Sequence, residues 1–120
     1  MMKVIQILLL GVCLLTGCAD ERDPLMAIEQ LGAGVQRDEM GEVIQIDLNA
    51  TAVTDDGLKD LEGLVHLRFL ELNQTGITDA GLTHLKGLST LETLLLFNTN
   101  VTDAGVAELE MALPNCTIRR

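Results

Sequence analysis

Hydrophobic and polar positions follow a pattern that recurs every 24 residues through the second half of the chain. Residues 67–88 read LRFLELNQTGITDAGLTHLKGL, and matching segments lie 24 positions earlier and 24 positions later. A Thr-Asp pair marks the phase of each copy: Thr54-Asp55, Thr78-Asp79 and Thr102-Asp103. A fixed period of this length is the signature of a repeat architecture, in which each copy stacks on its neighbours and buries a shared core.

Leucines within each copy follow the spacing L-x-x-L-x-L, which is typical of a leucine-rich-repeat solenoid. The sequence therefore predicts an α/β fold, with a parallel β-sheet on the concave side and helices on the convex side. Residues 46–120 would hold three repeats and a C-terminal cap. The strands are expected to be centred on Ile46-Asp47-Leu48, Leu70-Glu71-Leu72 and Leu94-Leu95-Leu96.

Side chains alternate between the two faces of a strand, so each predicted strand has an inward and an outward set. The inward set is aliphatic in every copy: Ile46, Leu48, Leu70, Leu72, Leu94 and Leu96. The outward set lines the concave face: Gln45, Asp47, Asn49, Phe69, Glu71, Asn73, Thr93, Leu95 and Phe97.

The concave face offers a small apolar patch. Phe69 and Phe97 are the only aromatic residues of the chain, and Phe69 would be a diagonal neighbour of Leu95. The candidate partner-binding residues are Phe69, Glu71, Asn73, Leu95 and Phe97. The alternative is an ordinary surface, on which scattered apolar residues are common.

Further columns of small or polar residues are explained by structure alone. One follows the strands, where a hydroxyl can satisfy backbone groups at a turn: Thr51, Thr75 and Thr99. Another suits helix N-caps: Thr54, Thr78 and Thr102. The aspartate after each N-cap suits the first helical turn, and the glycines at positions 57, 81 and 105 allow close packing between turns. Calcium binding by the aspartates is the alternative, but no loop supplies enough oxygen ligands. We predict no metal and no cofactor.

Residues 24–45 are predicted to cap the first repeat, because a solenoid otherwise exposes an apolar end. Leu25, Ile28 and Leu31 fall at helical spacing, and the glycines that follow should end that helix. A short strand at residues 35–37 and a turn at residues 39–42 would lead into the first repeat. An independent domain is the alternative, but 22 residues are too few to fold alone.

The N-terminal residues are predicted to be a targeting segment, namely a lipoprotein signal peptide. Residues 1–17 contain an apolar run with the length of a signal-peptide core, which is too short to span a bilayer. The sequence Leu15-Thr16-Gly17-Cys18 is similar to the bacterial lipobox, which implies lipidation of Cys18. Residues 18–23 would then be a short tether to the cell envelope, with the outer membrane or the periplasmic side favoured. Plain secretory cleavage after Ala19 is the alternative.

Composition and titratable residues narrow the range of functions that the sequence allows. A formal net charge of −10 argues against nucleic acid as a partner, although a negative surface also simply keeps a domain soluble. The cysteines form no zinc pattern and no disulfide framework, and Cys116 is expected to be a buried small hydrophobe. The two histidines, His66 and His84, lie in different columns without a nucleophile beside them, and common catalytic motifs are absent. The sequence predicts a protein that is not an enzyme.

Residues 46–120 resemble bacterial leucine-rich-repeat proteins of the 24-residue T-D-x-G-L type, within the ribonuclease-inhibitor-like architecture. Leu113-Pro114-Asn115-Cys116 fits their usual ending. The resemblance implies protein–protein interaction and names no partner. We expect a membrane-anchored module that binds a protein on its concave face. A structural envelope lipoprotein, or a short paralogue without a dedicated ligand, is the alternative. The register of the C-terminal segment and the oligomeric state stay open.

Overall fold

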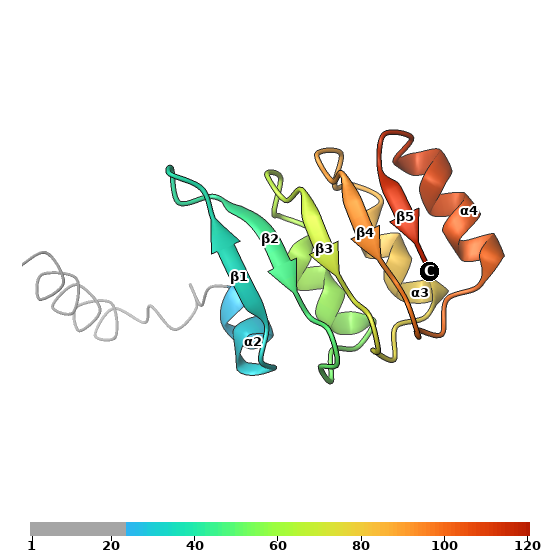
Figure 1. Ribbon diagram of the computed structural model, residues 1–120, viewed down its shortest axis with the longest axis horizontal. Coiled ribbons are helices and arrows are strands. Elements are labelled where there is room, and N and C mark those ends of the chain that lie inside the picture. Colours follow the sequence, from blue (N-terminus) through green and yellow to red (C-terminus); the bar gives the residue numbers. More distant parts are fainter. Residues whose placement is uncertain (1–23) are drawn as a thin grey trace, which may run out of the picture.

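The computed structural model describes residues 24–120, which form a mixed α/β fold around a five-stranded sheet (Figure 1). The strands lie in chain order across the sheet: β1 (Gly34–Arg37), β2 (Val43–Asp47), β3 (Phe69–Glu71), β4 (Thr93–Leu95) and β5 (Thr117–Arg119). β1 pairs with β2 antiparallel, and each later strand pairs parallel with the one before it. The predicted signal peptide, the tether and Cys18 lie outside the described residues.

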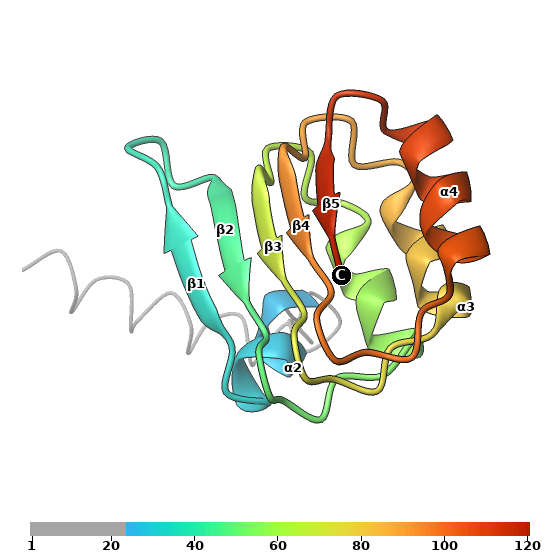
Figure 2. The same cartoon turned by 45° about the vertical axis from the view of Figure 1, so that its right-hand side comes forward.

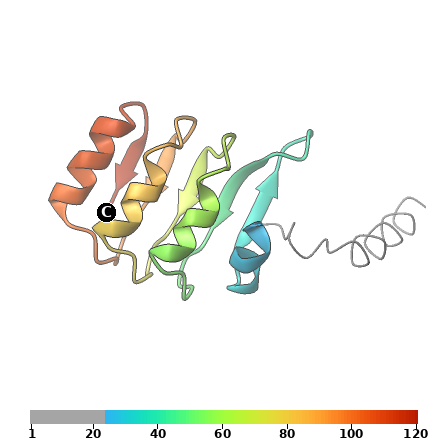
Figure 3. The same cartoon turned by 180° about the vertical axis from the view of Figure 1, so that it is seen from behind.

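The helical segments lie on one face of the sheet, as the view from behind shows (Figure 3). They are α2 (Pro24–Gln30), the 3-10 helix η2 (Asp56–Leu61), α3 (Asp79–Leu82), its 3-10 continuation η3 (Thr83–Leu85), and α4 (Asp103–Ala112). Figure 2 shows the sheet and the helices as two layers. Within residues 24–120, no helix is both long and apolar enough to cross a membrane.

The register of the parallel strands follows the 24-residue period of the sequence. Gln45 lies opposite Phe69, Phe69 opposite Thr93, and Thr93 opposite Thr117. The pairing extends past the ends of the strands, since the Leu48 amide donates to the Glu71 carbonyl at 2.8 Å. β5 continues the same spacing, which answers the question of register that the C-terminal sequence left open.

The core fills the space between the sheet and the helices. All six side chains expected to point inward from the strands are at most 1% exposed. Leu58, Leu82 and Leu109 from the helix side are also at most 1% exposed. Burying one such side chain contributes about 1.5–3 kcal/mol, so the leucine pattern drives the two layers together. The inward set predicted from strand alternation is confirmed.

The segment before the first parallel strand forms a helix and a hairpin, as expected, with one correction. Leu25 and Ile28 of α2 are buried, at 3% and 1% exposed. Leu31 is 38% exposed, so the expectation that it shares their buried face is wrong. The physical reason is that α2 ends at Gln30, and the chain turns at Gly32 with φ of +97°.

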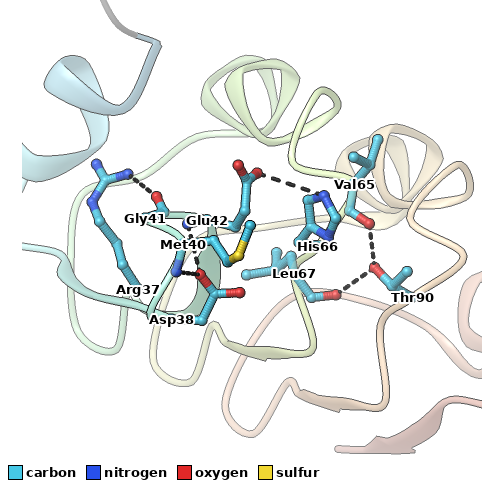
Figure 4. Close-up of polar contacts among 9 residues, drawn as sticks. All are labelled: Arg37, Asp38, Met40, Gly41, Glu42, Val65, His66, Leu67 and Thr90. Atoms are coloured by element: carbon cyan, nitrogen blue, oxygen red, sulfur yellow. Dashed lines mark hydrogen bonds and ion pairs between the residues drawn. The ribbon is translucent and has the colours of Figure 1, made fainter.

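The β1–β2 turn is organised by one aspartate (Figure 4). Asp38 Oδ1 accepts the amide hydrogens of Met40 at 2.8 Å and Glu42 at 3.0 Å. Gly41 adopts φ of +85°, a region that glycine enters without steric cost, and its carbonyl accepts from Arg37 Nη1 at 3.1 Å. The turn fixes the pairing of β1 with β2 at the start of the sheet.

The three Thr-Asp pairs precede helices of different types. Thr78 and Thr102 cap α3 and α4, and accept hydrogen bonds from the amides of Ala80 and Gly105. The first copy differs, because Asp55 directly precedes a 3-10 helix while Thr54 Oγ1 accepts from the Gly57 amide at 3.2 Å. The capping role expected for the threonines is therefore confirmed for α3 and α4 and is modified at η2.

Candidate functional site on the open sheet face

The sheet face without helices, which we call the open sheet face, carries the outward side chains of β2–β5 and of the turns that follow. They form three rows across the strands. The first row is Gln45, Phe69, Thr93 and Thr117. The second, which we call the charge row, is Asp47, Glu71, Leu95 and Arg119. The third is Asn49, Asn73 and Phe97, in which the Oδ1 atom of each asparagine accepts the amide hydrogen of the residue 24 positions later.

The predicted apolar residues gather over β3 and β4. The register places Phe69 opposite Thr93 and Leu95 opposite Glu71, so Phe69 and Leu95 are the diagonal neighbours expected from the sequence. Both are half-buried, whereas Phe97 is 42% exposed. Phe97 is therefore the most accessible apolar group of the three, although it lies just beyond the end of β4.

Phe69 has a neighbour that the sequence did not suggest. The guanidinium carbon of Arg68 lies 5.6 Å from the centroid of the Phe69 ring, within the range of a cation–π contact. Arg68 Nε is held in turn by Glu92 Oε2 at 2.6 Å. The arginine covers part of the ring, so Phe69 offers a partner less apolar surface than Phe97 does.

Two of the predicted binding residues are used inside the protein. Asn73 Oδ1 accepts the Phe97 amide at 2.8 Å, and Asn49 Oδ1 accepts the Asn73 amide at 2.9 Å. Glu71 accepts from Asn49 Nδ2 at 2.9 Å and from Gln45 Nε2 at 3.4 Å. Asn73 thus supports the backbone between neighbouring turns. Glu71 is bonded to neutral amides only, so its negative charge is not neutralised by these contacts. The recurrence of asparagine at one period was the available signal for this internal role.

Arg119 belongs to the same face and was missed by the sequence analysis. It lies opposite Leu95 at the end of the charge row. The inward neighbour, Ile118, packs against the core, which fixes the outward direction of Arg119 by alternation. The signal was available, because position 119 continues the series 47, 71 and 95, but the change of pattern after Leu109 obscured it.

An open hollow adjoins Phe97 at the β5 side of the sheet. Its volume is about 500 Å³, and it is lined by Phe97, Val106, Glu110, Ile118 and Arg119, among others. The lining mixes aliphatic side chains with the carboxylates of Asp103 and Glu110 and the guanidinium groups of Arg119 and Arg120. This composition suits a side chain of a partner that is partly apolar.

The aspartates on the helix side have a role that their capping position did not predict. Asp55 accepts both the amide of Thr78 at 2.8 Å and its hydroxyl at 2.6 Å. Asp79 makes the same pair of bonds to Thr102, at 2.7 and 2.5 Å. These bonds hold the pKa of Asp79 below its ordinary value. We call these contacts the Asp–Thr ladder.

Two glycines make room for the Asp–Thr ladder. A Cβ atom on Gly81 would lie 2.5 Å from Asp55 Oδ1, and one on Gly105 would overlap the Asp79 carboxylate. Gly57 differs, because its nearest neighbours are Val53 and Thr54 in its own copy. Close packing between turns, expected for all three glycines, therefore holds for Gly81 and Gly105 only.

The histidines join neighbouring turns. His84 Nδ1 lies 2.5 Å from Glu62 Oε2. Figure 4 shows the other pair, in which His66 Nε2 lies 3.6 Å from Glu42 Oε1. The Thr90 hydroxyl lies one period after His66, at 2.9 Å from the carbonyl oxygens of both Val65 and Leu67, and its one hydrogen is shared between these two acceptors. Each histidine is thus occupied by a carboxylate from an earlier turn.

The remaining chemistry-bearing residue in the described part of the chain is Cys116. It is half-buried against the core, and burial raises the pKa of its thiol to about 11. The thiolate, which is the reactive form, is therefore scarce at neutral pH. Among residues 24–120, no group of three or more His, Cys, Asp or Glu side chains is placed to hold a metal ion.

Comparison with known proteins adds no family to this description. A scan against protein-family models finds no match, and a search of curated proteins finds no similar sequence.

Proposed function

We propose that this protein is a membrane-anchored, non-catalytic module that binds a partner protein on its open sheet face. The observation that carries the proposal is the position of Leu95 and Phe97. They lie on the face that no described helix covers, and Phe97 is 42% exposed. Aromatic groups with apolar neighbours and flanking charges are the usual centre of a protein interface.

We also propose that the architecture is a short leucine-rich-repeat solenoid of the bacterial 24-residue type, with the open sheet face as its concave side. The support is the parallel register at 24-residue steps and the Asp–Thr ladder, which joins each turn to the next. Repeat proteins use extended sheet faces of this kind for binding.

The anchor is proposed from the lipobox-like Leu15-Thr16-Gly17-Cys18, and would place the module at the cell envelope. Its test is the migration of the full chain expressed in a bacterium, with and without an inhibitor of lipoprotein signal peptidase. We expect an inhibitor-sensitive, membrane-bound form that is lost in Cys18→Ala and kept in Cys13→Ala. A product that is cleaved and soluble whether or not Cys18 is present would contradict the anchor.

The binding proposal is tested by Phe97→Asp. A photo-crosslinking residue at Thr93, on the open sheet face, should capture a specific envelope protein, and Phe97→Asp should abolish the capture. The melting temperature should change little, because the ring is not part of the core. Met111→Asp is the matched control, since Met111 is 83% exposed on α4 of the helix side. Equal loss of capture in both variants, or none in either, would contradict binding on the open face.

The second candidate function is a structural envelope protein without a dedicated ligand. One observation favours it: Asn73, Glu71 and Phe69 all have contacts within the protein. This alternative predicts weakened envelope integrity in a deletion strain and no partner captured from the open face.

A further inference from the structure

The charge row changes sign across the open sheet face. Asp47 on β2 and Glu71 on β3 lie opposite each other, Leu95 follows on β4, and Arg119 ends the row on β5. Asp47 and Arg119 are exposed and Glu71 is half-buried, so all three charges are accessible to some degree. The face is therefore acidic at one end, apolar in the middle and basic at the other end.

These charges have no opposite charge of their own. The ion pairs found within residues 24–120 involve other residues, and none includes Asp47, Glu71 or Arg119. Like charges directly opposite each other on neighbouring strands destabilise a sheet. A cation supplied by a partner would relieve the repulsion between Asp47 and Glu71, and an anion would pair with Arg119.

The spacing of the charge row fits an extended chain that runs across the strands. Neighbouring strands lie about 4.8 Å apart, which puts Glu71, Leu95 and Arg119 at about 4.8, 9.6 and 14.4 Å from Asp47. In an extended segment, alternate side chains point the same way and recur about every 6.8 Å. A first side chain between Asp47 and Glu71, at about 2.4 Å, would place the next over Leu95 and the third beside Arg119.

We infer that the open sheet face binds an extended segment of the partner protein in which a basic, an apolar and an acidic side chain occupy alternate positions. The inference rests on the proposed function and gives the partner its chemistry. The basic side chain pairs with the carboxylates of Asp47 and Glu71. The apolar side chain packs on Leu95 and the exposed edge of Phe97. The acidic side chain pairs with Arg119.

A protein segment fits this face better than a nucleic acid or an anionic lipid surface does. A nucleic acid or an anionic lipid surface presents negative charge throughout, and the Asp47–Glu71 end would repel it. An extended polypeptide can change the sign of its side chains within about 14 Å, which is four residue steps, from the first to the fifth residue of the segment.

The test measures binding of labelled peptides to the full-length protein in detergent, by fluorescence anisotropy at low salt. The probe is Gly-Ser-Lys-Thr-Leu-Thr-Glu-Ser-Gly, and its three variants replace Leu by Ser, Lys by Glu, or Glu by Lys. Exposed ion pairs are individually weak, but Arg119→Glu replaces an attraction by a repulsion, so we expect it to weaken binding of the probe about three- to tenfold. The Glu-to-Lys peptide should bind wild type more weakly, and Arg119→Glu should restore it. This restoration is the coupling that a double-mutant cycle isolates.

Lys59→Glu is the matched control, because it makes the same change of charge on η2, on the helix side. We expect it to change binding less than twofold. An equal loss in Lys59→Glu and Arg119→Glu would overturn the inference, because net charge alone would then explain both. Binding that depends on Phe97 but not on Arg119 would also overturn it and leave the proposed function standing. If no peptide binds while crosslinking from the open face still captures a partner, the segment is wrong and the function stands. If both fail, both proposals fall.

Discussion

On the helix side of the sheet, the polar residues of one turn are held by the next. Asp55 and Asp79 each bond to a threonine 23 residues later, and Gly81 and Gly105 leave room for the contact. The residue types in these columns stay the same from copy to copy. The same contact is used at both steps, although the helical segments that it joins differ in type.

On the open sheet face, two of the rows change in residue type at the third copy of the sequence pattern. Asn49 and Asn73 are followed by Phe97, while Asp47 and Glu71 are followed by Leu95. In each of these rows, the side chains of the first two members make hydrogen bonds inside the protein, whereas the side chain of the third member is apolar and cannot. We interpret a residue type that stays constant from copy to copy as structural, and we propose that the two rows that change mark a surface available to a partner.

The largest loss of stability is expected from removing one contact of the Asp–Thr ladder. Asp55→Ala deletes both bonds to Thr78, and hydrogen bonds to charged groups contribute about 1.5–3 kcal/mol, so we expect a loss of about 2 kcal/mol. Urea unfolding of the purified protein measures it. Asp103→Ala is the control in the same column. Asp103 is 93% exposed and, among residues 24–120, forms an ion pair only with Arg120, so its loss should stay below about 0.5 kcal/mol. Equal losses in the two variants would show that the Asp–Thr ladder does not stabilise the contact between neighbouring turns.

A slightly smaller loss is expected from filling the space that the ladder uses. In Gly81→Ala, the new methyl group would displace the Asp55 carboxylate, and overpacking of this kind costs about 1–3 kcal/mol. The better helix propensity of alanine returns up to about 1 kcal/mol, which leaves a net loss of about 1–2 kcal/mol. In Gly57→Ala the new methyl group would meet a methyl group of Val53 at 3.2 Å and no carboxylate, so we expect a smaller loss than in Gly81→Ala. Thermal unfolding of the two variants decides, and an equal loss in both would contradict the role of Gly81.

Much of the fold follows from the sequence, because one period carries most of the information. The alternation around Leu70 and Leu94 predicts the buried set, and the threonines after each strand do bond to backbone carbonyls, as Thr75 does to Leu72 at 2.7 Å. The end of α2 before Leu31 was missed, because helical spacing continues in the sequence after the backbone has turned.

The candidate site was harder to predict than the core. Alternation places Phe97 and Leu95 on the outer face, and the strand register confirms the diagonal between Phe69 and Leu95. Alternation does not tell whether an outward side chain is already occupied, as Asn73 is, because its partner is a backbone amide 24 residues away. The position of Arg119 on this face depends on the register of β5, and the pairing of β5 with β4 in the structure establishes that register.

A gain in stability is expected where the turns after the strands adopt a positive φ. Ala50, Gln74 and Asn98 have φ of 57°, 59° and 58°, again at 24-residue steps. This left-handed region costs an ordinary residue about 1–2 kcal/mol, while glycine enters it freely and asparagine tolerates it. Glycine is also more flexible in the unfolded chain, so Ala50→Gly should gain about 1 kcal/mol at most. Asn98→Gly should change stability less. A loss in Ala50→Gly, measured by urea unfolding, would show that the Ala50 methyl group makes contacts of its own.

The smallest effect is expected from pH, and it tests the ladder without changing its shape. The Thr102 hydroxyl and amide hold the pKa of Asp79 below its ordinary value of 3.8. A carboxyl group with a lowered pKa in the folded state stabilises the protein fully above its unfolded-state pKa, and this contribution disappears as pH falls through the folded-state pKa. The free energy of unfolding should therefore fall more steeply below about pH 4 in wild type than in Asp79→Asn, which has no proton to gain there. Urea unfolding at several pH values between about 2.5 and 7 measures both slopes, over the range in which carboxylates titrate. Parallel slopes would mean that the Asp79–Thr102 bonds do not distinguish the charged carboxylate from the protonated one.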